Sequence, residues 1–153
     1  KEGRLAEADV KSLRGFRRLY DATFSRNLLT GSKVVCRLSE GRTGNVVDGD
    51  YDTSVLPDMK GGRAVFLFRM KHPAAFNVLS IQEDIRKGQR VEAFSLEVKD
   101  ARGKWKEAAA GTTVGHKRLL KFPIQTAGEV RLTIRQARAV PAISEIGLYR
   151  LVE

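Results

Sequence analysis

The sequence predicts an all-β fold: a jelly-roll β-sandwich of about eight strands, preceded by one amphipathic helix. Three observations carry this prediction. After residue 27, apolar and polar residues alternate with a period of two, which is typical of strands with one face on a core. Turn signals containing glycine separate these segments at short intervals, and no helical crossover lies between them. Short antiparallel strands of this kind form sandwiches or jelly rolls.

The first two dozen residues follow a helical period instead. We expect an amphipathic helix over about residues 6–24, with Glu7 and Asp9 near its N-terminus, where carboxylates are favourable. The apolar residues at helical spacing are Val10, Leu13, Phe16, Tyr20 and Phe24. This apolar stripe needs a cover, either from the following domain or from a preceding one that is no longer attached.

The expected strands follow in order. Alternating residues predict strands over 65–70, 94–99, 120–124 and 130–134, and a further strand is expected over 33–38. The turn signals are Lys60–Gly62, Lys87–Gly88, Asp100–Gly103, Gly111–Gly115 and Ala127–Gly128.

The composition fits one domain with enough apolar residues for a core, since 42% of the 153 residues are hydrophobic. The single cysteine excludes an internal disulfide, and we interpret Cys36 as a small buried apolar residue. No run approaches the ~20 apolar residues of a membrane helix. The chain begins at Lys1 with no signal-peptide pattern, so we expect a processed or excised fragment.

The net charge of +10 permits an anionic partner, such as nucleic acid, a sulfated or sialylated glycan, or a membrane surface. The Lys and Arg residues are spread along the chain with no run longer than two, which favours a solvated basic surface. A basic nucleic-acid- or anionic-glycan-binding module remains the alternative. It rests on the basic helix residues Lys11, Arg14, Arg17 and Arg18.

An acidic loop at residues 48–53 could hold a hard cation. Its sequence, Asp-Gly-Asp-Tyr-Asp-Thr, supplies carboxylates, a hydroxyl and a glycine that lets the backbone curl, and Glu145 would arrive from the last strand. Such oxygen donors suit Ca²⁺, although the spacing is not that of an EF-hand. The alternative is an Asp-Gly turn with solvated carboxylates.

A set of short motifs, in this order and spacing, resembles the C-terminal domain of bacterial α-L-fucosidases. The helix, with Gly3-Arg4-Leu5 and Asp9-Val10-Lys11-Ser12-Leu13, looks like the segment that joins the catalytic barrel to that domain, so the resemblance covers most of the chain. The motifs are Phe76-Asn77-Val78, Gln82-Glu83-Asp84-Ile85, Gly88-Gln89-Arg90-Val91, Gly103-Lys104-Trp105-Lys106, residues 111–118, Phe122-Pro123, residues 130–134, Ala137-Arg138-Ala139 and residues 143–149.

The resemblance implies a discoidin-like fold, similar to coagulation-factor type C and galactose-binding-like modules. It implies a linker helix over residues 1–27 and a sandwich over 28–153, both from a secreted or periplasmic glycoside hydrolase. The family's catalytic residues lie in a barrel that has no counterpart here, so no catalytic site is expected in this chain. Its partners would be that barrel and a galactose- or fucose-bearing glycan. It also implies a structural Ca²⁺ held by Asp48, Asp50 through its carbonyl, Thr53 and Glu145.

Five residues are candidates for contact with sugar: Glu83, Arg90, Trp105, His116 and Arg118. Each has an alternative role in the structure. Glu83 and Arg90 could form a buried polar latch or face the catalytic domain, and Trp105 could pack on its own hairpin. The sequence departs from related domains in lacking a tryptophan after Asp52-Thr53 and in having His116 where tyrosine is common. Glycan binding and support of the barrel both remain open.

No catalytic constellation is visible. Glycoside hydrolysis needs two carboxyl groups about 5–10 Å apart, and Glu83 and Asp84 are adjacent, so their side chains would point in opposite directions along a strand. No Ser-His-Asp order, zinc-ligand spacing or phosphate-binding loop appears in the sequence.

Overall fold

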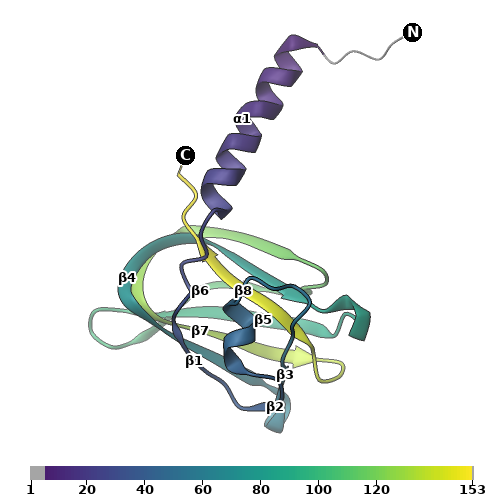
Figure 1. Cartoon of the computed structure of the whole chain (residues 1–153). Helices are drawn as coiled ribbons and strands as arrows, with labels where there is room; N and C mark the ends of the chain where they lie inside the picture. Colours follow the sequence, from purple (N-terminus) through teal and green to yellow (C-terminus); the bar gives the residue numbers. More distant parts are fainter. Residues whose placement is uncertain (1–5, 153) are drawn as a thin grey trace.

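Two long strands, each bent in the middle, organise the fold of the computed structural model, which describes residues 6–152. β4 (Ala64–Glu83) and β7 (Arg118–Ala137) pair antiparallel along almost their whole length and fold over together. At the bend the register shifts between Arg69 and Ala74, so β4 carries extra residues there. Pro73 lies in this bulge, beside Gly128 of β7. The two halves of the ribbon therefore enter two different layers (Figure 1).

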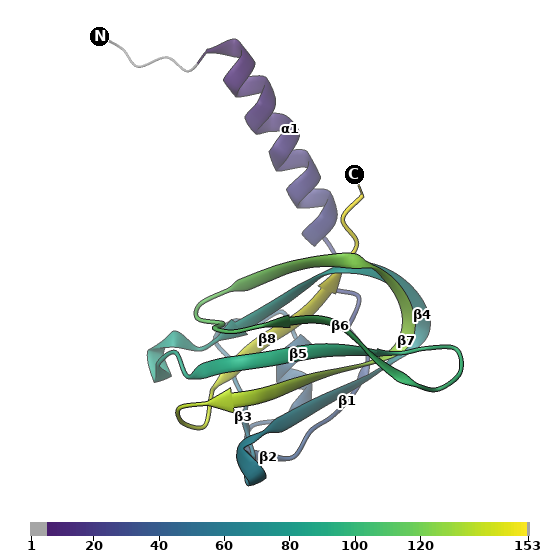
Figure 2. The same ribbon diagram turned by 180° about the vertical axis from the view of Figure 1, so that it is seen from behind.

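One layer contains the first half of β4 and the second half of β7. The strand order is β1-β4-β7-β5-β6, with β1 (Lys33–Val35), β5 (Val91–Lys99) and β6 (Trp105–Gly111). We call this the five-stranded layer. The other, three-stranded layer places the end of β4 between the start of β7 and β8 (Ile143–Tyr149). Figures 1 and 2 show β8 and the layer with β5 and β6 on opposite sides of the molecule. The predicted β-sandwich of about eight strands is confirmed.

Short elements complete the described chain. β2 (Leu38–Glu40) pairs with β3 (Leu56–Pro57), and the 3₁₀ segments are η1 (Thr43–Val47), η2 (Lys60–Gly62) and η3 (Ile85–Lys87). The core between the layers follows the predicted alternation. Phe66 and Phe68 are fully buried, whereas Val65 is 40% exposed. Other core residues include Leu79, Phe94, Leu96, Val130, Leu132, Ile134, Ile143 and Ile146.

The helix α1 (Glu7–Phe24) has the predicted bounds to within a residue and projects away from the sandwich (Figure 1). Thr23 is its one buried residue. Its aromatic side chains form a ladder that runs down onto β8. Ring centroids lie 6.2 Å apart for Phe16 and Tyr20, 4.7 Å for Tyr20 and Phe24, and 4.8 Å for Phe24 and Tyr149.

Asn27 fastens the segment after the helix to the edge of β8. Its Nδ2 donates to the Ile146 carbonyl (2.9 Å), and its Oδ1 accepts from the Leu148 and Leu29 amides (3.1 and 3.0 Å). The Leu28 amide donates to the Leu148 carbonyl in return. The segment thereby satisfies backbone groups of an edge strand that would otherwise be exposed.

Two expectations from the sequence were wrong. The strand expected over 33–38 is broken at Cys36 and Arg37, where the chain leaves β1 and enters β2. Ala127–Gly128 is not a turn between strands but the bend inside β7. Cys36 is half-buried against the core, and burial raises the pKa of its thiol to about 12.

The N-terminal motif Gly3-Arg4-Leu5 and the last residue of the expected sandwich, Glu153, lie outside the described residues. Within residues 6–152, no helix has the length and apolar character needed to cross a membrane.

Candidate binding site at one end of the sandwich

Three connections meet beyond the end of β4 and enclose a hollow of about 240 Å³. They are the acidic loop at residues 48–53, the turn that contains η3, and the loop between β6 and β7. Loops at one end of a sandwich are where binding residues of this architecture commonly gather. The hollow is lined by Tyr51, Asp52, Gln82, Glu83, Asp84, Ile85, Arg86, His116 and Ser144.

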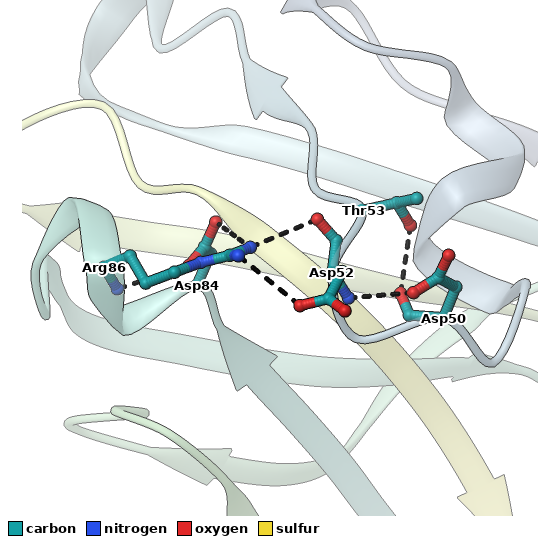
Figure 3. A network of polar contacts seen from close by, with 5 residues as sticks. All are labelled: Asp50, Asp52, Thr53, Asp84 and Arg86. Atoms are coloured by element: carbon teal, nitrogen blue, oxygen red, sulfur yellow. Dashed lines mark hydrogen bonds and ion pairs between the residues drawn. The ribbon is translucent and has the colours of Figure 1, made fainter.

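Arg86 bridges two of these connections (Figure 3). Its Nε and Nη2 donate to the two carboxylate oxygens of Asp84 (2.7 and 3.1 Å). The same guanidinium donates to the Asp52 carbonyl (3.1 Å) and lies 3.4 Å from the Asp52 carboxylate. The hydrogen bonds from Arg86 hold the pKa of Asp84 below its usual range, so the pair is charged at neutral pH. The bridge fixes the acidic loop against the turn after β4.

Glu83 forms the floor of the hollow as a buried latch. Its Oε1 accepts from the Arg90 and Val91 amides (2.8 and 3.0 Å), and its Oε2 accepts from the Gly115 amide (2.9 Å). The side chain is only 2% exposed. Glu83 therefore ties the end of β4 to the start of β5 and to the loop before β7, and its carboxylate oxygens are occupied by backbone donors.

The other four sugar candidates do not converge. His116 is exposed and lines the hollow. Arg90 donates through Nη1 to the Val140 carbonyl (2.6 Å). Arg118 is half-buried at the start of β7, and its Nε has no hydrogen-bond partner in the described part of the chain. Trp105 begins β6 in the other layer, with the Arg131 guanidinium 4.4 Å from its ring centroid.

The acidic loop brings oxygen atoms together next to β8. Thr53 Oγ1 lies 2.9 Å from Asp48 Oδ2 and 3.0 Å from the Asp50 carbonyl oxygen. Glu145 is 4% exposed, and its carboxylate accepts from the Gly49 amide (3.2 Å) and from Asn27 Nδ2 (3.3 Å). Burial, with a smaller contribution from the charge of Asp48, raises the pKa of Glu145 to about 7.

The chemical types of these oxygen donors match those that Ca²⁺ prefers in proteins. Ca²⁺ prefers six to eight oxygen ligands that mix carboxylates, carbonyls and hydroxyls. Asp48, the Asp50 carbonyl, Thr53 and the neighbouring Glu145 supply that mixture. Among residues 6–152 there is no group of three or more His, Cys, Asp or Glu side chains arranged to hold a metal, so the fit depends on the carbonyl and hydroxyl.

Sequence reasoning missed Arg86, Asp52 and Tyr51 as residues of this hollow. Arg86 follows Asp84 by two residues just after a strand, which is the one local signal that could have indicated a salt bridge at a turn. Its contact with Asp52 spans 34 positions in the sequence. No local pattern predicts that contact, because it depends on how the loop folds back over the end of the sandwich.

The same β-sandwich fold occurs in solved proteins. The Clostridium perfringens protein CpGH89CBM32-5, solved in complex with GalNAc-β-1,3-galactose, superimposes with a TM-score of 0.69 over 81% of this chain and 99% of its own. At 15% sequence identity this likeness concerns the fold alone. No protein-family model matches the chain.

The chain is a fucosidase-related domain. Alpha-L-fucosidase 1 of Arabidopsis thaliana is 34% identical over 155 residues, which cover 96% of this chain and 31% of that protein. A GH29 fucosidase of Ruminococcus gnavus, solved in complex with fucose, superimposes with a TM-score of 0.87 at 28% identity and covers 99% of this chain and 32% of that one. The chain thus spans about a third of the length of the relatives it matches.

Proposed function

We propose that this chain is a non-catalytic accessory domain of an α-L-fucosidase-like glycoside hydrolase, and that it docks on the catalytic domain through α1. One observation carries the docking role: the apolar stripe of the helix is exposed. The exposed fractions are 56% for Leu13, 67% for Phe16, 43% for Leu19 and 37% for Tyr20. A contiguous apolar surface on an otherwise solvated helix is typical of an interaction site.

The apolar stripe also continues from the helix into the sandwich. This is what we expect if the helix connects a bound catalytic domain rigidly to the sandwich. Phe24 packs edge-on against Tyr149, and Asn27 ties the following segment to β8. A partner bound to Phe16 and Tyr20 would therefore be connected through packed rings and hydrogen bonds to the three-stranded layer. This continuity supports a rigid attachment rather than a loose tether.

The test uses the protein encoded by the whole natural reading frame that contains this chain. We expect that frame to encode a catalytic domain and the purified protein to hydrolyse an aryl α-L-fucoside. The double variant Leu13→Ser/Phe16→Ser should inactivate at a lower temperature than wild type. The matched control Lys11→Ser/Arg18→Ser, on the opposite face of the helix, should behave as wild type. A reading frame without a catalytic domain would overturn the accessory role, and equal inactivation temperatures would overturn the docking role.

Glycan binding at the hollow is the second candidate function. His116 and Tyr51 are exposed at its rim, and Arg86 offers a fixed guanidinium, which is the kind of group that pairs with sugar hydroxyls. On an array of galactose- and fucose-bearing glycans, the chain should be retained, and His116→Ala should weaken retention. Arg26→Ala, an exposed cation between the helix and the sandwich, is the control. A folded wild-type chain with no retention on any spot would exclude this role.

We propose further that Asp48, the Asp50 carbonyl, Thr53 and Glu145 bind a structural Ca²⁺, whose charge would hold the acidic loop against β8. An ion bound only by the folded chain raises its melting temperature. Adding Ca²⁺ to chelator-treated protein should raise the melting temperature of wild type but not of Asp48→Asn. The same rise in both proteins, or in neither, would exclude the site.

A further inference from the structure

The outer face of the five-stranded layer carries a second hollow, of about 320 Å³. Its lining residues lie on or next to the first half of β4, the second half of β7 and β5. Figure 2 shows the layer with β5 on the opposite side of the molecule from β8. The lining residues are Arg63, Val65, Glu97, Arg131, Thr133 and Arg135. Three guanidinium groups and the Glu97 carboxylate line it, and Glu107 pairs with Arg135 from outside the lining, so this group of five side chains has a net charge of +1.

The register of the strands explains this arrangement. Val65 pairs with Thr133, and Thr133 pairs with Ser95, so small side chains form the floor across three strands. Arg131 and Arg135 stand two residues to either side of Thr133 on the same strand face. Arg63 precedes β4 and lies opposite Arg135, because Ala64 pairs with Ile134. The long arginine side chains therefore surround a shallow surface formed by the shorter side chains.

The guanidinium groups are held in place but retain free donors. Arg131 donates through Nε and Nη2 to both Glu97 oxygens (2.6 and 3.0 Å) and stacks on Trp105. Arg135 donates through Nε to Ser95 Oγ (2.8 Å) and through Nη2 to Glu107 (3.1 Å). In both, Nη1 takes part in none of these bonds, and a guanidinium has five N–H groups in total. Arg63 has no ion pair or side-chain hydrogen bond among the described residues.

We propose that this hollow, which we call the arginine face, binds the acidic group of a glycan: a sulfate or a uronate carboxylate. Planar guanidinium forks match both groups with paired, charge-assisted hydrogen bonds. Thr133 supplies a hydroxyl at the floor. Trp105 lies next to the hollow rather than in its lining, with the Arg131 guanidinium over its half-buried ring, so a sugar bound to Arg131 would lie beside this ring. The site is separate from the helix stripe and from the hollow lined by His116, so it can be tested without a catalytic domain.

The experiment measures binding of the chain to three oligosaccharides of equal length by calorimetry at constant ionic strength. The probes are a sulfated heparin-type hexasaccharide, a hexagalacturonate and a neutral galactose hexasaccharide. We expect binding of one or both acidic probes and none of the neutral one. The two acidic arms distinguish a sulfate from a carboxylate as the group that is recognised.

Variants locate the site. Arg63→Gln/Arg135→Gln should weaken binding of the acidic probe by roughly tenfold or more, because charge-assisted hydrogen bonds are lost. Arg26→Gln/Arg42→Gln removes the same charge from exposed positions outside the hollow and should leave the affinity within about twofold, since distant surface charges are screened. Arg63→Lys/Arg135→Lys keeps the charge without the fork and should bind more weakly than wild type.

Three results with the glycan probes would overturn the proposal. They are no binding of either acidic probe, an equal loss in the Arg26/Arg42 control, and wild-type affinity in the Lys pair. Duplex DNA is added as a competitor. If DNA binds more tightly than both glycans, with a steep dependence on salt, the face is a nucleic-acid site and the glycan assignment is wrong. Circular dichroism of each variant confirms that it is folded before its affinity is compared.

Discussion

At the scale of residues, several carboxylates of this chain are occupied by its own backbone. Glu83 accepts three backbone amide hydrogen bonds while almost fully buried. Asp100 accepts from the Arg102 and Lys104 amides in the β5–β6 hairpin, and Asp48 accepts from the Asp50 amide. A carboxylate used in this way stabilises loops at the end of the sandwich.

The latch formed by Glu83 predicts a large effect from a small change. In Glu83→Gln one carboxylate oxygen becomes an NH₂ group, so at least one of the Arg90, Val91 and Gly115 amides loses its acceptor. Leaving a buried donor unpaired costs about 1–3 kcal/mol. We expect the free energy of unfolding in urea to fall by that amount. Glu40→Gln, at an exposed position in β2, should change it by less than about 0.5 kcal/mol. A similar small effect at Glu83 would show that the latch is not formed.

The ion pair between Glu97 and Arg131 predicts a pH dependence. Hydrogen bonds from Arg131 hold the pKa of Glu97 below its usual range in the folded chain. The unfolded state therefore takes up this proton first as the pH falls below about 5, and the pair's contribution to stability is lost through the folded-state pKa. The stability difference between wild type and Glu97→Gln should shrink from pH 6 to pH 3 in urea titrations. A difference that stays constant over this range would contradict the ion pair.

At the scale of elements, the sequence predicts features set by local residue patterns, and it misses features set by contacts between distant segments. Helical spacing from Val10 to Phe24 predicted α1, and alternation predicted the buried faces of β4, β5 and β7. The bend was missed, because Ala127–Gly128 carries the same signal as a turn. Only the pairing of β7 with the bulge at Pro73 makes it a corner within one strand.

The residues of the candidate site also divide into those that a local pattern predicted and those that it did not. His116 was predicted in a loop and lies in one, at the rim of the hollow. The bridge from Arg86 to Asp52 could not be predicted, because it joins two turns that are distant in sequence. Trp105 was a candidate for the same site, but the register of β5 with β6 places it over the other layer, beside Arg131. Strand pairing, rather than residue type, decides which side chains meet.

The pairing of β5 with β6 makes a prediction of its own. Gly111 lies opposite Phe94, and a Cβ at Gly111 would stand 2.5 Å from the buried Phe94 ring. Gly111→Ala should therefore push this ring out of position and lower the free energy of unfolding by about 1–3 kcal/mol. Gly44→Ala is the matched control, since a Cβ there meets nothing within 4 Å. Equal thermal stabilities for the two variants would mean that β6 is not held closely over Phe94.

At the scale of the whole molecule, two surfaces of different character lie apart. The helix stripe and Tyr149 adjoin the three-stranded layer, whereas the arginine face covers the five-stranded layer. An apolar stripe suits a permanent partner, because its exposure is unfavourable when the partner is absent. A cationic hollow with free donors suits a soluble ligand. The arrangement would let the domain stay attached through one side while the other remains open.

The junction between helix and sandwich gives the last prediction. A chain that lacks residues 1–22 loses little buried surface, since it keeps Thr23, the one buried residue of α1, and Phe24, which packs on Tyr149. Its melting temperature should lie within about 3 °C of that of the full chain. A chain that lacks residues 1–29 also loses the Asn27 hydrogen bonds and Leu29, which is 1% exposed. Burial of one leucine alone is worth about 2–5 kcal/mol, so the longer truncation should melt much lower or fail to fold. If the shorter truncation melts as low as the longer one, the helix belongs to the cooperative unit of the sandwich, and its apolar stripe serves stability rather than docking.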